Sequence, residues 1–220
     1  MKRGSLVVLA SCAAALVLAC QASCAGEDRR SSDEFRKEFL ARFPKNGLCT
    51  TPEDARLLRV LIEARRAQRG VEVGSYTGFG AIHMGIGFER TGGRLDTIEI
   101  DPATARKCRE NVKAVGLEKT VTVIEGDALQ VLPKLEGEVD FVFIDALKQD
   151  YFKYFKAIEP RLKPGAVIVA DNTIAYASAM RDFLDFMRNS PDYEAVTVRA
   201  SDAKHDGMTV CIKVRQGREK

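Results

Sequence analysis

The sequence has no concentration of positive charge that would indicate a nucleic-acid partner. Its 34 lysines and arginines are opposed by 31 aspartates and glutamates, which leaves a formal net charge of +3, and the basic residues are scattered. Proteins that bind DNA or RNA instead carry basic patches or stripes. We therefore expect no nucleic-acid partner and assign most lysines and arginines to an ordinary mixed surface.

Cysteine and histidine show no spacing that would indicate a zinc site or a disulfide framework. Three of the six cysteines lie in the first two dozen residues, and the others, Cys49, Cys108 and Cys211, are far apart. Free cysteine is often buried as a small apolar residue, so we expect Cys108 and Cys211 in the core. His83 falls in an expected helix and His205 in a polar stretch, and neither receives a role.

The N-terminal apolar run is shorter than the roughly 20 residues that a membrane-spanning helix needs. It covers residues 6–19, follows Lys2 and Arg3, and precedes small residues and then charges. This arrangement is typical of a signal peptide, which would end near Ala25. The run up to Cys20 also resembles a bacterial lipoprotein signal, and an uncleaved anchor facing the cytosol is a third reading. We expect residues 1–25 to direct export or membrane attachment.

The rest of the chain is long enough for one domain with a full-sized core. We assign residues 26–47 to a helical lead-in, 48–215 to the domain and 216–220 to a charged tail. Apolar patterns predict strands at 71–73, 95–100, 121–124, 141–144 and 166–170, each followed by a helix, and then two half-exposed strands around 196–198 and 208–214. This order predicts an α/β fold: a mostly parallel sheet with helices on both faces and a terminal strand pair.

Capping and turn residues in the sequence predict where some helices and strands begin or end. Thr51 and Pro52 are typical of a helix start, with Asp54 completing a capping box. Residues 163–165 read as a turn before the fifth strand, and a last helix is expected over roughly 178–187.

Ligands of such sheets bind at the carboxyl ends of the strands. The first strand carries Glu72 and runs into a turn with glycines at Gly74, Gly78 and Gly80. Tyr76 stands where the dinucleotide fingerprint G-x-G-x-x-G needs its second glycine. An acid beside this turn suits a cationic ligand better than a pyrophosphate, although a plain strand-to-helix turn stays open.

Acids also end the second and third strands. Glu99 lies slightly more than 20 residues beyond the glycine turn, a distance at which an acid can bind both hydroxyls of a ribose. Together with the turn it indicates a nucleoside ligand that needs no phosphate site. Asp127 could accept a hydrogen bond from an adenine amino group or merely cap the next helix.

Three oxygen donors end the fourth and fifth strands, which we expect to be neighbours in the sheet. They are Asp145, Asp171 and Asn172, and hard oxygen ligands suit Mg²⁺. The alternative is that the aspartates cap helices and Asn172 only turns the chain. Lys148 follows Asp145 by one helical step and could act as a base, whereas an isolated lysine is more often a solvated surface residue.

The combined pattern resembles the catechol and caffeoyl-CoA O-methyltransferase family over about residues 45–214. The matching segments are 72–80, 97–101, 125–128, 140–148 with Tyr151, 169–172 and 206–207. The resemblance implies a seven-stranded class I methyltransferase fold with a reversed terminal hairpin. It also implies S-adenosylmethionine as methyl donor, a divalent cation such as Mg²⁺ and a small phenolic acceptor.

The resemblance implies a role for each candidate residue. Glu99 would hold the ribose of the cofactor, Glu72 would lie near its methionine part, and Asp127 near its adenine. Thr50, Gly74, Tyr76, Gly80 and Asp145 would line the cofactor site. Asp145, Asp171 and Asn172 match the metal ligands of the family, and Lys148 matches its general base.

Some features depart from the family or leave alternatives open. In catechol-acting members an acid from the loop before the last strand holds the second hydroxyl, and only Asp202 is a candidate here. S-adenosylmethionine is made in the cytosol, which conflicts with an exported enzyme. A nicotinamide-dependent oxidoreductase and a non-catalytic nucleoside-binding protein remain alternative functions, and a homodimer stays possible.

Overall fold

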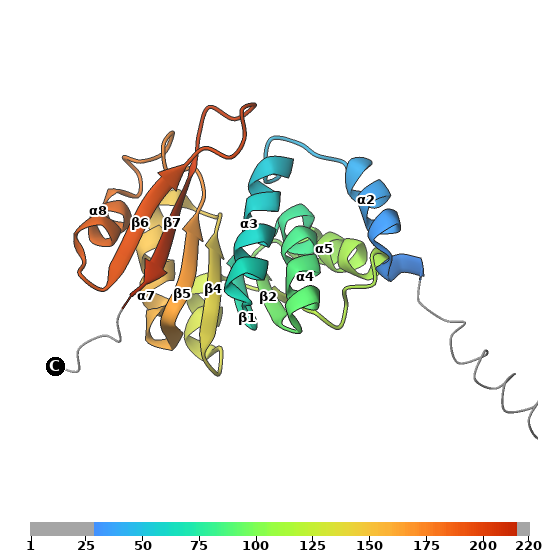
Figure 1. The fold of residues 1–220 in the computed structure, drawn as a ribbon, viewed down its shortest axis with the longest axis horizontal. Helices are drawn as coiled ribbons and strands as arrows, with labels where there is room; N and C mark the ends of the chain where they lie inside the picture. Colours follow the sequence, from blue (N-terminus) through green and yellow to red (C-terminus); the bar gives the residue numbers. More distant parts are fainter. Residues whose placement is uncertain (1–28, 215–220) are drawn as a thin grey trace, which may run out of the picture.

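A seven-stranded sheet forms the centre of the computed structural model, which describes residues 29–214 (Figure 1). The strand order is β3-β2-β1-β4-β5-β7-β6. The strands are β1 Arg69–Val73, β2 Arg94–Glu99, β3 Val121–Glu125, β4 Val139–Ile144, β5 Leu162–Ala170, β6 Tyr193–Val198 and β7 Met208–Lys213. The first five pair in parallel, and β7 runs antiparallel to both β5 and β6. The predicted fold class is confirmed.

Helices cover both faces of this sheet. The α-helices are α2 Asp33–Ala41, α3 Pro52–Arg65, α4 Phe79–Thr91, α5 Pro102–Ala114, α6 Ala128–Val131, α7 Tyr151–Ile158 and α8 Arg181–Asn189. Short 3-10 turns are η1 Arg29–Ser31, η2 Leu132–Lys134, η3 Lys148–Asp150 and η4 Glu159–Arg161. Because side chains alternate along a strand, Phe141 and Phe143 pack toward α3, α4 and α5, whereas Val142 and Ile144 pack toward α7 and α8.

The strand order reverses direction between β1 and β4, at the middle of the sheet. On one side of this point the chain proceeds to β2 and β3, and on the other to β4 and β5. Parallel sheets bind ligands outside the carboxyl ends of their strands at such a reversal. The glycine turn after β1 and the segments after β2, β4 and β5 all lie at this edge.

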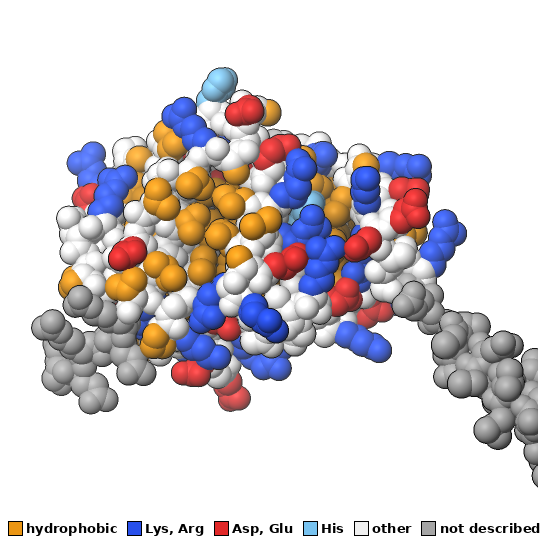
Figure 2. Space-filling model, in the orientation of Figure 1, with side chains coloured by type: hydrophobic (Ala, Val, Ile, Leu, Met, Phe, Trp, Pro, Cys, Tyr) orange, Lys and Arg blue, Asp and Glu red, His pale blue; other side chains and the backbone are white. Residues whose placement is uncertain are grey.

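One half of the sheet keeps apolar side chains at the surface. Hydrophobic side chains gather on the face in view, over β5, β7 and β6 and beside α3 (Figure 2). Val196 on β6 and Ile212 on β7 are among the exposed large hydrophobic residues. The other apolar residues of β7, including Cys211, are largely buried, and Cys108 on α5 is buried in the core as expected.

Two predicted boundaries are wrong. The segment 163–165 was expected to be a turn, but β5 begins at Leu162, which pairs with Val139. Pro164 and Gly165 lie where the pairing of β4 with β5 shifts register, between the partners of Val139 and Phe141. Strands tolerate proline at such irregular points.

The last helix begins later than expected, at Arg181 instead of 178. Asp206 accepts hydrogen bonds from the backbone N–H groups of Ile174 and Ala175, at 3.0 and 2.9 Å. These bonds fix the segment after β5 as turns. Local sequence patterns could not predict this contact, because Asp206 is more than thirty residues away.

The helix start at Thr51 has only half of the expected capping box. The Thr51 hydroxyl accepts a bond from the Asp54 N–H at 3.2 Å. The Asp54 side chain, however, bonds the ammonium of Lys204 at 3.2 Å. A buried carboxylate needs a cation more than it needs a second cap, so tertiary structure overrides the local motif.

The expected signal segment, its cleavage or lipidation site and the charged tail lie outside the described residues. Within residues 29–214, no helix is both long enough and apolar enough to span a membrane.

Candidate active site

A cavity of about 960 Å³ opens at the carboxyl edge of the sheet. Ten of the eleven residues predicted to form the site line it: Thr50, Gly74, Tyr76, Gly80, Glu99, Asp127, Asp145, Lys148, Asp171 and Asn172. The eleventh, Glu72, lies just below the cavity wall and is 1% exposed. The sheet brings together strand-end residues from Gly74 to Asn172, and the segment before α3 adds Thr50.

The turn after β1 needs glycine for two physical reasons. Gly74 has a φ of +89°, and a Cβ there would lie 2.2 Å from the carbonyl oxygen of Asp145. At Gly80, a Cβ would lie 3.0 Å from the Glu72 carboxylate and 3.3 Å from the Thr50 hydroxyl. The backbone thus comes close to neighbouring groups at both ends of the turn, which keeps the cavity open above it.

Glu72 is a buried acid whose carboxylate faces the floor of this turn. The Thr97 hydroxyl on neighbouring β2 donates to its Oε2 at 2.5 Å. Burial and, to a smaller extent, the negative charges of Asp145 and Glu99 raise the pKa of Glu72, and the Thr97 bond lowers it; together they bring this pKa to about 8. A cation bound above the turn would favour the ionised carboxylate.

Glu99 closes the turn from the end of β2. Its Oε2 accepts the backbone N–H of Tyr76 at 2.9 Å, and its Oε1 accepts that of Asp101 at 3.0 Å. Tyr76 has a left-handed φ of 46°, and its hydroxyl accepts a bond from the Asn46 amide at 2.5 Å. Two backbone bonds therefore hold the Glu99 carboxylate fixed at the cavity wall.

Asp127 fits both readings that the sequence left open. Its side chain caps α6 by accepting the N–H of Leu129 at 2.9 Å, and the residue also lines the cavity.

Lys148 and Asp145 form an ion pair after β4. The Lys148 ammonium donates to Asp145 Oδ1 at 2.8 Å and to the Tyr151 hydroxyl at 2.9 Å. Burial and the charge of Asp145 raise the pKa of Tyr151, so this hydroxyl stays protonated. The lysine is only partly exposed, and its nitrogen is held in place between the two oxygens.

Asp171 and Asn172 lie one strand further along, after β5. The Asn172 amide group donates to Asp206 Oδ2 at 3.0 Å, an orientation that leaves its oxygen available to a ligand. Both Asp171 oxygens accept from the ammonium of Lys204, at 2.5 and 2.7 Å. Burial and the charge of Asp145 raise the pKa of Asp171, and Lys204 opposes them.

The sequence analysis assigned no site role to Lys204, Asp206, Asp54 or Thr97, although Asp206 and Thr97 lie in segments that match the family. Thr97 could have been found as the β2 neighbour of Glu72, since the two are paired in the register. Lys204 had no signal, because it lies in a polar stretch that reads as a surface loop. Asp202, the candidate for holding a second hydroxyl, does not line the cavity, whereas Lys204 does.

The residues present fit both groups that the resemblance implies. Two carboxylates and one amide oxygen are hard donors of the kind that bind Mg²⁺, and the Lys204 ammonium on Asp171 shows that this point accepts a positive charge. Within residues 29–214, no three histidine, cysteine, aspartate or glutamate side chains are grouped so that they could hold a metal ion by themselves. Glu99 and the open turn fit a nucleoside.

The sequence matches the O-methyltransferase family over residues 22–213. The chain belongs to that family. This confirms the predicted enzyme class, an S-adenosylmethionine-dependent O-methyltransferase on a class I fold.

Relatives of this O-methyltransferase carry related names. It is 30% identical to a catechol O-methyltransferase of Mycobacterium tuberculosis over 200 residues, which cover 85% of this chain and 90% of the relative. It is 33% identical to a catechol O-methyltransferase of Niastella koreensis over 139 residues, 61% of this chain and 62% of that relative. A caffeoyl-CoA O-methyltransferase of Medicago sativa is 26% identical to this chain, and the match covers 81% of this chain and 80% of the relative.

Solved structures show the same fold. A cofactor-bound MTB protein superposes with a TM-score of 0.74 at 27% identity, covering 91% of this chain and 97% of its own. An O-methyltransferase from Bacillus cereus in complex with SAH superposes with a TM-score of 0.73 at 23% identity, covering 90% and 97% of the two chains.

Proposed function

We propose that this O-methyltransferase depends on a divalent cation and transfers the methyl group of S-adenosylmethionine to a hydroxyl of a small phenolic, catechol-like substrate. The observation that carries the proposal is the meeting of Asp145, Lys148 and Asp171 in one cavity whose opposite wall holds Glu99. One side of the cavity thus suits a nucleoside, and the other suits a hydroxyl that must lose its proton.

The cofactor side is formed by residues that accept hydrogen bonds or leave space. Glu99 would accept the ribose hydroxyls, and Asp127 would lie at the adenine. The Glu72 carboxylate would face the amino group of the methionine part across Gly80, next to the Thr50 hydroxyl. S-adenosylmethionine supplies the methyl group as an activated sulfonium, so alignment of donor and acceptor would account for much of the rate.

The acceptor side would activate a phenol. Asp145, Asp171 and the Asn172 oxygen would hold the cation, which when bound lowers the pKa of a hydroxyl that it coordinates. Lys148 would receive the proton of that hydroxyl as the neutral amine, after its ammonium has released one proton to solvent. The contacts of its nitrogen with Asp145 and Tyr151 fix where that amine lies.

The rim of the cavity fits an aromatic substrate. Leu48, Leu147 and Tyr176 line it and are 69%, 53% and 52% exposed. Exposed apolar side chains around a polar centre are typical of a site that binds an apolar ring and fixes its polar groups.

The proposal is tested by turnover of S-adenosylmethionine with catechol, with and without a chelator, analysed by product mass. Wild-type protein should lose turnover in excess chelator and regain it with Mg²⁺, and Asp145→Ala should be at least about 100-fold slower. Glu110→Gln, at an exposed ion pair with Lys107 on α5, is the control. Turnover that persists in chelator and in Asp145→Ala would rule out the cation mechanism. No turnover on any phenol would favour a non-catalytic nucleoside-binding protein.

A further inference from the structure

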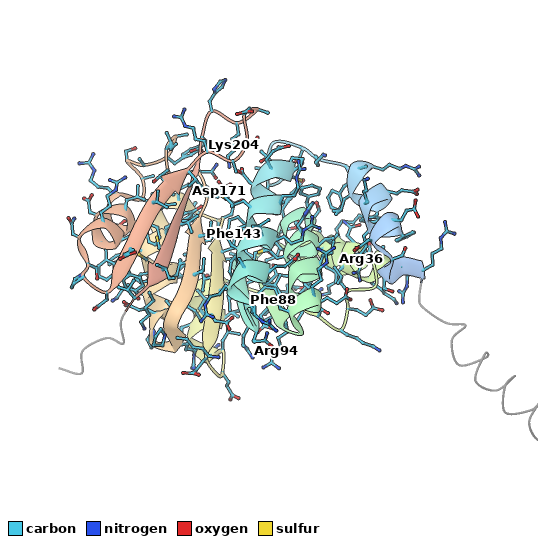
Figure 3. All side chains as sticks on the ribbon, in the orientation of Figure 1. Arg36, Phe88, Arg94, Phe143, Asp171 and Lys204 are labelled. Carbon is cyan, nitrogen blue, oxygen red and sulfur yellow. The ribbon has the colours of Figure 1, made fainter. Side chains whose placement is uncertain are left out.

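Lys204 joins two buried carboxylates that come from different parts of the fold. It lies in the loop between β6 and β7, and its ammonium bonds both oxygens of Asp171 at 2.5 and 2.7 Å and Asp54 Oδ2 at 3.2 Å. Figure 3 shows Lys204 close to Asp171 at the end of the sheet, on the loop that rises above it. Asp171 and Asp54 are 2% and 1% exposed. One lysine thus bridges the end of β5 and the first turn of α3.

In this arrangement the Lys204 ammonium occupies a carboxylate that a bound divalent cation would also need. A Mg²⁺ ligand lies at about 2.1 Å from the ion, and a carboxylate oxygen bound to the ion has lost the lone pair that it offered to an ammonium. Asp171 Oδ1 also accepts the Asn172 N–H at 2.7 Å, so Oδ1 already has two donors and Oδ2 has one. An ion bound to either oxygen would lie next to the Lys204 ammonium, and because like charges repel at this distance, it would favour movement of the ammonium away from Asp171.

We infer that Lys204 is an internal competitor that sets how tightly the site at Asp171 binds a divalent cation. The inference rests on the proposed cation site. If the ammonium holds Asp171 most of the time, the apparent affinity for the ion falls in proportion to the fraction of molecules in which Asp171 is free. Asp54 keeps a place for the displaced ammonium, because its carboxylate already bonds the same nitrogen.

Displacement of Lys204 also changes the wall of the cavity. Ala203 and Lys204 both line the cavity, and the same loop continues into Asp206, which bonds Asn172. Cation binding at Asp171 therefore couples to the position of residues 199–207. The loop that borders the substrate space takes up a different arrangement when the ion is bound.

The test is a titration of the protein with Mn²⁺ alone, with free Mn²⁺ followed by electron paramagnetic resonance. Lys204→Met should bind Mn²⁺ about tenfold more tightly than wild type or better. Lys107→Met removes a lysine from an exposed pair with Glu110 and should match wild type. The double variant Lys204→Met with Asp171→Asn should lose the increase in Mn²⁺ affinity, which would show that the increase arises at Asp171.

Two further measurements guard against a variant that fails to fold. Lys204→Met leaves the buried Asp54 carboxylate without a cation. The double variant Lys204→Met with Asp54→Asn removes that unpaired charge, and it should bind Mn²⁺ as tightly as Lys204→Met does. In wild-type protein, Mn²⁺ should speed amide exchange in residues 200–206.

The outcomes separate the inference from the proposed function. If wild type and both Lys204 variants bind Mn²⁺ equally, and Asp171→Asn abolishes binding, the cation site stands and the competition is refuted. Weaker binding by the Lys204 variants refutes it as well. If no form binds Mn²⁺, the proposed cation site fails together with the inference.

Discussion

Glu72 is the residue with the clearest expected dependence on pH. Its raised pKa of about 8 means that most molecules carry the neutral acid at pH 6. A cationic ligand above the turn prefers the carboxylate, so binding must remove a proton. The affinity for S-adenosylmethionine, measured by calorimetry, should therefore strengthen from pH 6 to pH 8, and Glu72→Gln should bind weakly with little pH dependence over this range.

A matched variant checks that Glu72 is the group responsible. The Thr97 hydroxyl lowers the pKa of Glu72 by donating to it, so Thr97→Val should move the pH midpoint for binding upward. The stability of the fold should change with pH in the opposite direction to the binding affinity. Because the pKa of Glu72 is raised in the folded state, its contribution to stability is fully present below the unfolded pKa and is lost as pH rises toward 8. An unchanged midpoint in Thr97→Val would assign the pH dependence to another group.

Lys148 should be required for turnover but not for cofactor binding. Its ammonium contacts Asp145 and Tyr151, at the place where a substrate hydroxyl would lose its proton. Removing a positioned base typically costs 10²–10⁴ in rate. Lys148→Met should therefore lower kcat by about this factor and keep its affinity for S-adenosylhomocysteine. Lys153→Met, which breaks an exposed pair on the same segment, should keep full turnover.

The sequence located the site residues that follow directly after strands, because parallel strands must end at the same edge. Glu99, Asp145 and Asp171 were all found in this way. Lys204 was not, because its position depends on how a polar loop folds back over the sheet. The same reason hides Asp54, whose sequence pattern indicated a helix cap and whose side chain in fact pairs with that loop.

Among the elements, the turn from β1 to α4 has the strictest steric requirement. A Cβ at Gly74 would lie 2.2 Å from a backbone oxygen of the segment after β4, and the φ there is +89°. Gly74→Ala should therefore lower the free energy of unfolding by about 3 kcal/mol or more, through strain and through separation of β1 from β4. Denaturant unfolding measures this change.

Gly92 is the matched control for Gly74, because it has a φ of +75° and nothing within 4 Å of its Cβ position. Gly92→Ala meets only the backbone strain and should cost about 1 kcal/mol. Equal losses of unfolding free energy in the two variants would show that the contact with the Asp145 carbonyl oxygen does not contribute to the cost.

Element positions were predicted best where the pattern was continuous. The apolar run at 141–144 lies within β4, and both faces of it are covered by helices. Pro164 and Gly165 misled the prediction, because a pairing of Leu162 with Val139 extends β5 through residues that favour turns. Strand pairing supplies hydrogen bonds that local propensity does not register.

At the scale of the whole molecule, α2 packs its apolar side chains into the core, and one buried arginine also ties it to two other helices. Arg36 on α2 bonds the Glu89 carboxylate at 2.5 and 3.1 Å and the carbonyl oxygen of Val115 at 2.9 Å. It is 2% exposed and ties α2 to the ends of α4 and α5 (Figure 3). The segment after α2 contains Asn46 and Thr50, which line the cavity.

The attachment of α2 should therefore affect the cofactor site from a distance. Arg36→Met removes one partner of a partly buried ion pair, a change that typically costs 3–5 kcal/mol when the pair is fully buried and less here, since Glu89 is partly exposed. We expect a loss of about 2 kcal/mol, faster amide exchange in residues 33–41, and an affinity for S-adenosylhomocysteine several-fold below that of wild type. Arg56→Met, at an exposed pair with Glu53, should change none of these. Faster exchange in α2 with unchanged affinity would show that the segment around Asn46 and Thr50 holds its position without α2.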